Sequence, residues 1–180
     1  MNMRDLSQYD NSGYQPGRSA FVRGLWYCTN VLFFKTACFP FYRFKRVLLR
    51  TFGAQVGKEV VIKPCVNIKY PWRLRIGDYS WIGENVWIDN LSDVTVGAHC
   101  CISQGALLLC GNHDYTKESF DLSTTPVSIG DGAWVGARAV VCPGVSMGEG
   151  AVLTAGSVAT GELAPQTVYQ GNPATPKKKY

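Results

Sequence analysis

The sequence predicts a mainly β protein, a parallel β-helix in which the chain winds around a flat-sided prism. From residue 56 it falls into six-residue units led by an aliphatic residue, as in "IGDYSW", "IGENVW", "IGDGAW" and "VGARAV". Groups of three units restart at residues 56, 76 and 96, so one turn takes about twenty residues. A six-residue period is unlike an α-helix and too long for simple strand alternation. It is typical of a β-helix coil with three short faces.

The leading aliphatic residues should point into the prism and stack on their equivalents in neighbouring coils. They are Val56, Ile62, Ile68, Ile76, Ile82, Ile88, Val96, Ile102, Leu108, Ile129, Val135, Val141, Met147, Leu153 and Ala159. The residue four places after a leader should also point inward, where space is limited, and it is often Val, Ser, Ala or Cys. Stacked coils leave the ends of the prism open, so a cap is required.

The chain divides into three predicted parts. Residues 1–55 form an N-terminal tail and helical cap, residues 56–171 form the β-helix with an active-site loop at 111–126, and residues 172–180 form a basic C-terminal tail. The cap sequence is apolar and aromatic, and Pro40 should break or kink its helix. It has too few uninterrupted apolar residues to cross a membrane, which takes roughly 20. Two interpretations remain: it covers the open end of the prism, or it also contacts an anionic membrane surface.

The composition fits one domain in a reducing cytoplasm. The chain has 180 residues, of which 46% are hydrophobic, so it can bury a sizeable core. The net charge is +5, and residues 1–50 hold eight Lys/Arg against two Asp, so the basicity is not a nucleic-acid footprint across the fold. Seven cysteines without a Cys-x-x-Cys pair argue against a disulfide framework and a cysteine zinc site. The polar first 20 residues lead us to expect no signal peptide.

The repeat stops at "CGNHDYTKESFDLSTTP", residues 110–126. A prism of flat faces has no cleft of its own, so a protruding segment, together with a neighbouring subunit, is expected to build one. His113 stands where the chain leaves the coil. Imidazole has an unperturbed pKa of about 6.5, so this side chain suits general acid–base catalysis near neutral pH, taking a proton from an attacking group and returning it to a leaving group.

These repeats resemble the hexapeptide-repeat acyltransferases. The motif "GNHDY", with "PWRLRIGDYSWIGENVWIDNL" before it, is similar to the branch that contains the colanic acid biosynthesis acetyltransferases. The ending "VYQGNPA" is typical of sugar O-acetyltransferases, and the resemblance spans about residues 20–175. It implies a left-handed coil, acetyl-coenzyme A as donor without a metal, and a homotrimer with active sites between adjacent subunits.

The resemblance also implies roles for single residues. It assigns the general base to His113. Asp114 is a candidate to orient the imidazole or contact a sugar hydroxyl, with a turn-forming Asp as the alternative. Asn85 and Asp89, one coil earlier, are expected to contact the acceptor.

Contacts with the donor are expected on the coils that follow the loop, where the corners "GARA" and "TAGS" are small. Small residues let a pantetheine arm lie along the groove between coils. The resemblance places these contacts at Ala137, Ala155 and Thr160. Gly161 stands where relatives often have Lys, and Lys178 in "PKKKY" is a candidate to meet the phosphates of coenzyme A instead.

Four further side chains have competing interpretations. Cys110 lies three residues before His113 and suggests a Cys–His pair, but its place at the end of "LLLC" favours core packing. His99 is expected to face outward as a surface or subunit contact. Tyr115 and Phe120 either stack on a sugar ring or anchor the loop.

We therefore expect an acetyl-coenzyme A–dependent O-acetyltransferase that acts by direct transfer on a sugar hydroxyl in bacterial exopolysaccharide or surface polysaccharide biosynthesis. The acceptor is a sugar or a lipid-linked saccharide, and the enzyme is expected in the cytoplasm, with peripheral contact at the inner membrane face. The alternatives are an N-acetyltransferase on a nucleotide-linked amino sugar and a non-catalytic assembly subunit built from the same repeats. A zinc carbonic anhydrase on this solenoid needs three imidazoles, and the chain has two histidines.

Overall fold

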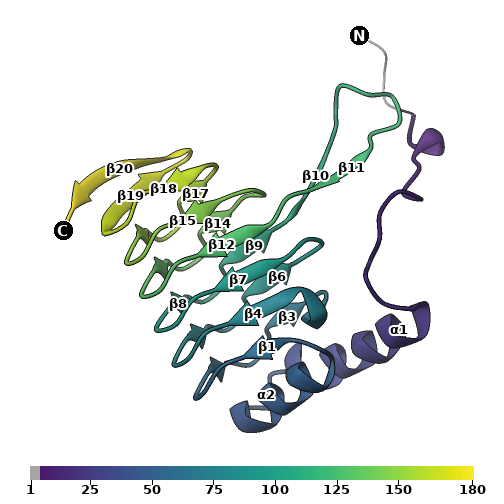
Figure 1. Ribbon diagram of the computed structural model, residues 1–180, viewed down its shortest axis with the longest axis horizontal. Coiled ribbons are helices and arrows are strands. Elements are labelled where there is room, and N and C mark those ends of the chain that lie inside the picture. Colours follow the sequence, from purple (N-terminus) through teal and green to yellow (C-terminus); the bar gives the residue numbers. More distant parts are fainter. Residues whose placement is uncertain (1–4) are drawn as a thin grey trace.

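The repeat winds into a three-faced parallel β-helix in the computed structural model, which describes residues 5–180 (Figure 1). Each complete coil contributes a short strand to each face, and strands of successive coils pair in register. Val56 pairs with Ile76, and Ile62 pairs with Ile82, one turn further along the chain. The predicted β-helix is confirmed.

The faces are sheets built from strands of successive coils. The first face comprises β1 (Gln55–Val56), β4 (Leu74–Ile76), β7 (Val94–Val96), β12 (Val127–Ile129), β15 (Ser146–Met147) and β18 (Glu162–Leu163). The second comprises β2 (Val61–Ile62), β5 (Trp81–Ile82), β8 (Cys101–Ile102), β13 (Trp134–Val135), β16 (Val152–Leu153) and β19 (Thr167–Gly171). The third comprises β3 (Asn67–Ile68), β6 (Trp87–Asp89), β9 (Leu107–Leu109), β14 (Val140–Val141) and β17 (Val158–Ala159). The corner between the third and first faces carries the longer connections, including the 3₁₀ turn η3 (Pro71–Arg73).

The interior of the prism follows the predicted pattern. Every leading aliphatic residue from Val56 to Ala159 is buried. The residues four places on are also buried where the repeat holds: Val60, Val66, Ser80, Val86, Cys100, Ala106, Ala133, Ala139, Val145, Ala151 and Ser157. Burial of one aliphatic side chain contributes about 1.5–3 kcal/mol, so this ladder is the main source of stability.

The coils stack tightly at the corner between the first and second faces. Gly77 lies at this corner, where a Cβ would come within 2.4 Å of the amide nitrogen of Ala98 in the next coil. Real Cβ atoms do not approach main-chain atoms so closely. Glycine is therefore required here by the spacing between coils.

The N-terminal helices cover the open end of the first coil (Figure 1). Trp26, Phe34 and Leu49 are buried against that coil, and Pro40 lies in the break between the helices. The elements of this cap are α1 (Ala20–Thr29), the π-helix η2 (Asn30–Phe34) and α2 (Tyr42–Thr51).

The direction of hydrogen bonding between coils leaves the carbonyl groups at this end without a donor from another coil. The N–H groups of one coil donate to the C=O groups of the next, as Gly57 N does to Ile76 O (2.8 Å). The C=O groups of the first coil therefore face the open end without a coil beneath them. A buried carbonyl left unpaired costs about 1–3 kcal/mol.

Basic side chains of α2 supply the missing donors. They are Lys45 to Lys63 O (2.9 Å), Arg46 to Val60 O (3.1 Å) and Arg50 to Val56 O (2.7 Å). Lys45 is fully buried, and burial lowers its pKa to about 8. Part of the positive charge in residues 1–50 thus has a structural role in capping the solenoid.

The C-terminal segment 172–180 forms a strand in place of the predicted tail. β20 (Ala174–Lys179) folds back and pairs antiparallel with β19, and the Tyr180 hydroxyl donates to Gly150 O. The last coil has no further coil to pair with, so its free edge offers main-chain groups to this segment.

Candidate active site

A β-hairpin projects from the stack after β9, at the corner between the third and first faces (Figure 1). Its strands, β10 (Gly111–His113) and β11 (Leu122–Thr124), pair antiparallel. At the base of the hairpin, Thr125 N donates to Cys110 O (2.9 Å). The predicted active-site loop is therefore anchored on the rigid coil and carries His113 beyond the prism surface.

The imidazole of His113 is held by Phe120 across the hairpin. His113 Nδ1 lies 2.9 Å from the carbonyl oxygen of Phe120. A carbonyl oxygen only accepts hydrogen bonds, so Nδ1 carries the proton of the neutral ring. Nε2 is then unprotonated, as a general base requires. The Phe120 ring also stacks on the imidazole, with centroids 4.3 Å apart and planes 2° apart.

Phe120 adopts an unusual backbone conformation to make these contacts. Its φ is +50°, a left-handed region that costs a bulky residue about 1–3 kcal/mol. The turn holds it there, since Phe120 N donates to Lys117 O (3.2 Å). Sequence reasoning offered sugar stacking or loop anchoring for this ring, whereas the structure places it on His113.

Asp114 organises the tip of the hairpin. Its Oδ1 accepts hydrogen bonds from the Thr116 hydroxyl (2.6 Å) and the Thr116 amide (3.0 Å). These bonds, the hydroxyl first, hold the pKa of the Asp114 carboxyl below its ordinary value. Lys117 adds an ion pair to Asp121 at 2.9 Å. The imidazole is thus oriented by the Phe120 carbonyl, while Asp114 bonds within its own turn.

The segment that precedes α1 runs along the flank of the solenoid to the hairpin (Figure 1). Its 3₁₀ turn η1 (Leu6–Gln8) follows Asp5, whose N–H donates to Glu118 O (3.1 Å). The ring of Tyr9 lies 5.9 Å from that of His113. Sequence reasoning missed this contact because the segment lies outside the repeat and carries no motif.

Asn85 lies in the turn before β6 and Asp89 is the last residue of this strand, so they lie at different corners. Asn85 has a φ of +58° at the corner between the second and third faces, a conformation that Asn tolerates better than most residues. Asp89 lies where the hairpin begins, and its carbonyl oxygen accepts from Cys110 N (3.3 Å). Its carboxylate lies 3.2 Å from Lys69 Nζ. Of this pair, Asp89 shares its corner with His113.

Ala137 and Ala155 occupy the same corner of successive coils. Gly156 N donates to Ala137 O (2.9 Å), so the two coils are in direct contact there. A cavity of about 450 Å³, lined in part by Gly83 and Ser103, lies on the second face near the same corner of the preceding coils, and neither alanine is in its lining. The small side chains and the cavity leave room for an extended ligand.

Thr160 and Lys178 lie away from that corner. Thr160 follows β17 at the corner between the third and first faces, and Lys178 is exposed on β20, opposite Val168. The subunit does not bring them to Ala137 and Ala155, because the chain crosses a whole face between these corners. Their contacts with the donor stay predictions.

Cys110 and His99 have the surroundings of structural residues. Cys110 is buried, and burial raises the pKa of its thiol to about 11, so it stays protonated at neutral pH and does not act as a thiolate nucleophile. His99 is exposed and stacks on Tyr79, with ring centroids 5.3 Å apart.

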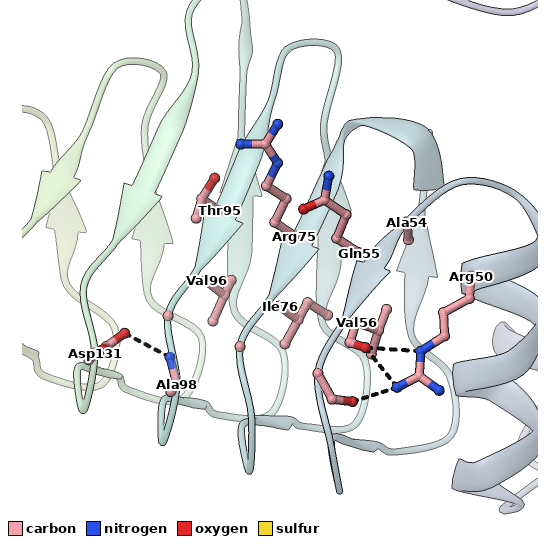
Figure 2. Close-up of a pocket in the computed structure, with 13 residues that line it drawn as sticks. Arg50, Ala54, Gln55, Val56, Arg75, Ile76, Thr95, Val96, Ala98 and Asp131 are labelled. Atoms are coloured by element: carbon pink, nitrogen blue, oxygen red, sulfur yellow. Dashed lines mark hydrogen bonds between the residues drawn. The ribbon is translucent and has the colours of Figure 1, made fainter.

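A broad hollow of about 680 Å³ lies on the first face, apart from the hairpin (Figure 2). Gln55, Arg75 and Thr95 point outward along it from successive coils, and Arg50 bonds to Val56 O at one end. None of the predicted site residues is part of its described lining. This hollow is therefore separate from the predicted site at the hairpin.

Comparison with known sequences finds similar proteins over most of the chain. Residues 126–160 match a family model described as the hexapeptide repeat of succinyl-transferase. The chain is 40% identical over 173 residues to the "Putative colanic acid biosynthesis acetyltransferase WcaF" of Escherichia coli, covering 96% of this chain and 94% of the relative. It is 29% identical over 129 residues to the galactoside O-acetyltransferase of E. coli, covering 70% and 64% of the two chains.

Solved structures show the same fold. A hexapeptide-repeat acetyltransferase from Vibrio cholerae, complexed with acetyl coenzyme A, matches with a TM-score of 0.81 and 22% identity over 98% of both chains. A galactoside acetyltransferase in complex with coenzyme A matches with a TM-score of 0.78 and 24% identity, covering 88% of this chain and 80% of that one. With the full-length similarity to WcaF, these findings show that the chain is an acyltransferase and belongs to the hexapeptide-repeat acetyltransferase family.

Proposed function

We propose that this enzyme is an acetyl-coenzyme A–dependent O-acetyltransferase that modifies a sugar hydroxyl during bacterial exopolysaccharide or surface polysaccharide biosynthesis. The observation that carries the proposal is the bond between His113 Nδ1 and the Phe120 carbonyl, which leaves Nε2 free as the base. The names of the WcaF relative and the galactoside O-acetyltransferase support a saccharide acceptor.

In the proposed reaction His113 first accepts a proton from the acceptor and then donates it to the leaving group. Nε2 takes the proton of the acceptor hydroxyl while its oxygen attacks the carbonyl carbon of the thioester. The C–S bond breaks, and the imidazolium returns the proton to the leaving thiolate sulfur. The proton and the acetyl group are both accounted for, so no acyl-enzyme is required. The Nδ1–H bond to Phe120 O holds the ring throughout.

The proposed binding residues are divided between the hairpin corner and more distant parts of the solenoid. Asp89 is the proposed acceptor contact that shares the hairpin corner, and Asn85 is a second; for Asp114 the bonds to Thr116 favour the turn-forming alternative over a contact with the acceptor. Ala137 and Ala155 are proposed to line the path of the donor, with Thr160 and Lys178 as further contacts. The small corner residues and the neighbouring cavity support this path.

A homotrimer with active sites between subunits is part of the proposal. Trp81 and Trp134 on the second face and Trp87 on the third are about half exposed, and exposed apolar side chains of this size mark interaction surfaces. Light scattering should give a mass three times the 19.8 kDa of one chain. A monomer mass would remove the shared site from the proposal.

We propose a cytoplasmic location at the inner membrane face. No helix within residues 5–180 is long and apolar enough to cross a membrane. Phe21, Leu25 and Leu32 recur on the outer side of the α1–η2 segment and are 79%, 51% and 63% exposed. Residues 11–58 contain eight Lys/Arg and no Asp or Glu, which complements an anionic bilayer.

Vesicle flotation tests this membrane contact. The protein should float with vesicles that contain phosphatidylglycerol and stay behind with phosphatidylcholine alone. Leu25→Asp should abolish flotation, because it places a carboxylate between the exposed apolar side chains of Phe21 and Leu32. Flotation that is independent of lipid charge, or retained in the variant, would contradict the contact.

The enzymatic proposal is tested by thiol release from acetyl-coenzyme A with a panel of sugar acceptors. His113→Ala should lower turnover by roughly 10²–10⁴ without changing thermal stability. His99→Ala is the matched control, because it removes the other histidine from an exposed corner. Hydroxylamine treatment of the product separates an O-ester, which is cleaved, from the N-acetyl alternative. Full activity in His113→Ala would exclude the proposed mechanism.

A further inference from the structure

A second cavity, of about 310 Å³, lies between the helical cap and the third face. Trp87 offers an aromatic surface to it, and Tyr27 lines it from the opposite side. Its charged lining comes from both parts of the chain: Arg23 and Lys35 from the cap, and Lys69 and Asp89 from the coils.

Two polar atoms in this lining lack hydrogen-bond partners. Among the described residues, Arg23 Nε and Asp89 Oδ1 are both buried and unbonded. Asp89 Oδ1 lies 3.2 Å from Lys69 Nζ, which is an ion-pair distance without hydrogen-bond geometry. Most buried polar atoms are paired, so each unpaired one points to a missing partner. A guanidinium only donates and a carboxylate only accepts, so the fitting ligand supplies both an acceptor and a donor.

The charge of the lining favours an anion. Three cations, Arg23, Lys35 and Lys69, face one carboxylate, Asp89, which leaves two positive charges. Within residues 5–180, Lys69 pairs with Asp89, whereas no ion pair neutralises Arg23 or Lys35. A pyrophosphate diester carries about two negative charges, one on each phosphate, and Arg and Lys are the side chains that bind phosphate oxygens best.

The carboxylate side of the cavity adjoins the hairpin. Asp89 O accepts from Cys110 N (3.3 Å), and the three residues from Cys110 to His113 span at most about 10 Å. Arg23 and Lys35 lie on the cap side. A sugar near Asp89 and Trp87 would therefore present its hydroxyls toward the base, with an anionic substituent directed to the cap.

We infer that this cavity binds the pyrophosphate of an activated sugar, in which pyrophosphate joins the acceptor saccharide to its carrier. The inference rests on the proposed function, because it names the chemical form of the acceptor used at the His113 site. Arg23 and Lys35 bind the phosphate oxygens, and Asp89 accepts from a sugar hydroxyl. A nucleoside or a polyprenyl lipid supplies the same pyrophosphate, so the two carriers are separate arms of the test.

Isothermal titration calorimetry with the purified full chain tests the cavity. The probes are inorganic pyrophosphate, UDP and farnesyl pyrophosphate, each titrated into the wild type and into an Arg23→Gln, Lys35→Gln double variant. The double variant should weaken binding of every probe that binds by at least about tenfold, because both phosphate donors are lost. Arg43→Gln is the control, since Arg43 is an exposed cap residue outside the cavity lining, and it should stay within about twofold of the wild type.

The experiment distinguishes a nucleotide carrier from a lipid carrier, and failure of this inference from failure of the proposed function. Tighter binding of UDP supports a nucleotide carrier, and tighter binding of farnesyl pyrophosphate supports a lipid carrier. Equal affinities in the wild type and the double variant, or no binding of any probe, would overturn the inference. Thermal unfolding shows whether each variant is folded. Binding requires no acetyl transfer, so absent thiol release refutes the proposed function, whereas absent binding beside His113-dependent release refutes this inference alone.

Discussion

The stacked coils and the hairpin differ in what holds their side chains. In the coils each inward residue meets an equivalent residue above and below, and Ile82 and Ile102 have no exposed surface. In the hairpin the side-chain contacts are partly exposed and mostly between residues close in sequence, as between Asp114 and Thr116. Segments with few buried apolar contacts contribute little to global stability. Stability therefore resides in the coils and the proposed chemistry in the hairpin, and substitutions should separate the two.

The largest expected effect is on the coils. Gly77→Val places a Cβ 2.4 Å from Ala98 N, so neighbouring coils must move apart and the free energy of unfolding should fall by at least about 3 kcal/mol. Urea unfolding followed by tryptophan fluorescence measures it. Gly161→Val is the control, because no heavy atom lies within 4 Å of its added Cβ. Equal stability of both variants would contradict the coil spacing.

The cap should show a pH-dependent stability. The pKa of Lys45 is about 8 in the folded state and 10.5 in its unperturbed state. Between these values the unfolded chain binds more protons, so the stability of the wild type relative to Lys45→Met should rise with pH. The expected rise is up to about 3 kcal/mol. Urea unfolding across this range measures it, with exposed Lys58→Met as the control, and a constant difference would contradict charge burial at Lys45.

In the hairpin, Phe120→Ala should reduce turnover without reducing stability. It removes the ring that stacks on His113, a contact worth about 1 kcal/mol, so kcat should fall by roughly fivefold to tenfold. The thermal midpoint should stay within about 1 °C, since the Phe120 ring packs on the hairpin rather than in the core of the coils. Phe120→Tyr keeps the ring and should restore turnover. A large loss of stability in Phe120→Ala would place part of the folding core in the hairpin.

The smallest expected effect is that of Asp114→Ala. Asp114 bonds to Thr116 within its own turn, so kcat and KM should change by less than about threefold. Asp89→Asn provides the comparison, because it alters the carboxylate next to the hairpin base and should raise the KM for the acceptor. A tenfold rise in KM for Asp114→Ala would instead support direct contact with the acceptor.

The same contrast explains what the sequence could predict. The buried aliphatic residues of the coils could be predicted because every coil repeats the same environment at a fixed sequence spacing. The choice of His113 followed from a motif and from its position where the repeat breaks. Its partner Phe120 was not predictable in that role, because the contact depends on a left-handed backbone and on a hairpin without periodicity.

The contacts made by the two terminal segments were also not predicted. The approach of Tyr9 to His113 and the return of β20 onto β19 are long-range contacts without sequence signals. The basic residues of the cap were visible as charge, but their acceptors are main-chain carbonyls, which every sequence possesses. Composition could therefore indicate a cap or a membrane contact without identifying the hydrogen bonds.

The carbonyl-binding cap has a consequence for the dimensions of the molecule. Lys45 and Arg50 bind main-chain groups that any coil would present, so these hydrogen bonds of the cap do not depend on the side chains of the coil. Coils can then be added or removed above it without rebuilding the terminus. The cap covers the first coil and the hairpin leaves the third, two spacings of about 4.8 Å away. The number of coils between the cap and the hairpin therefore sets the distance of His113 from the cap, in steps of one coil spacing.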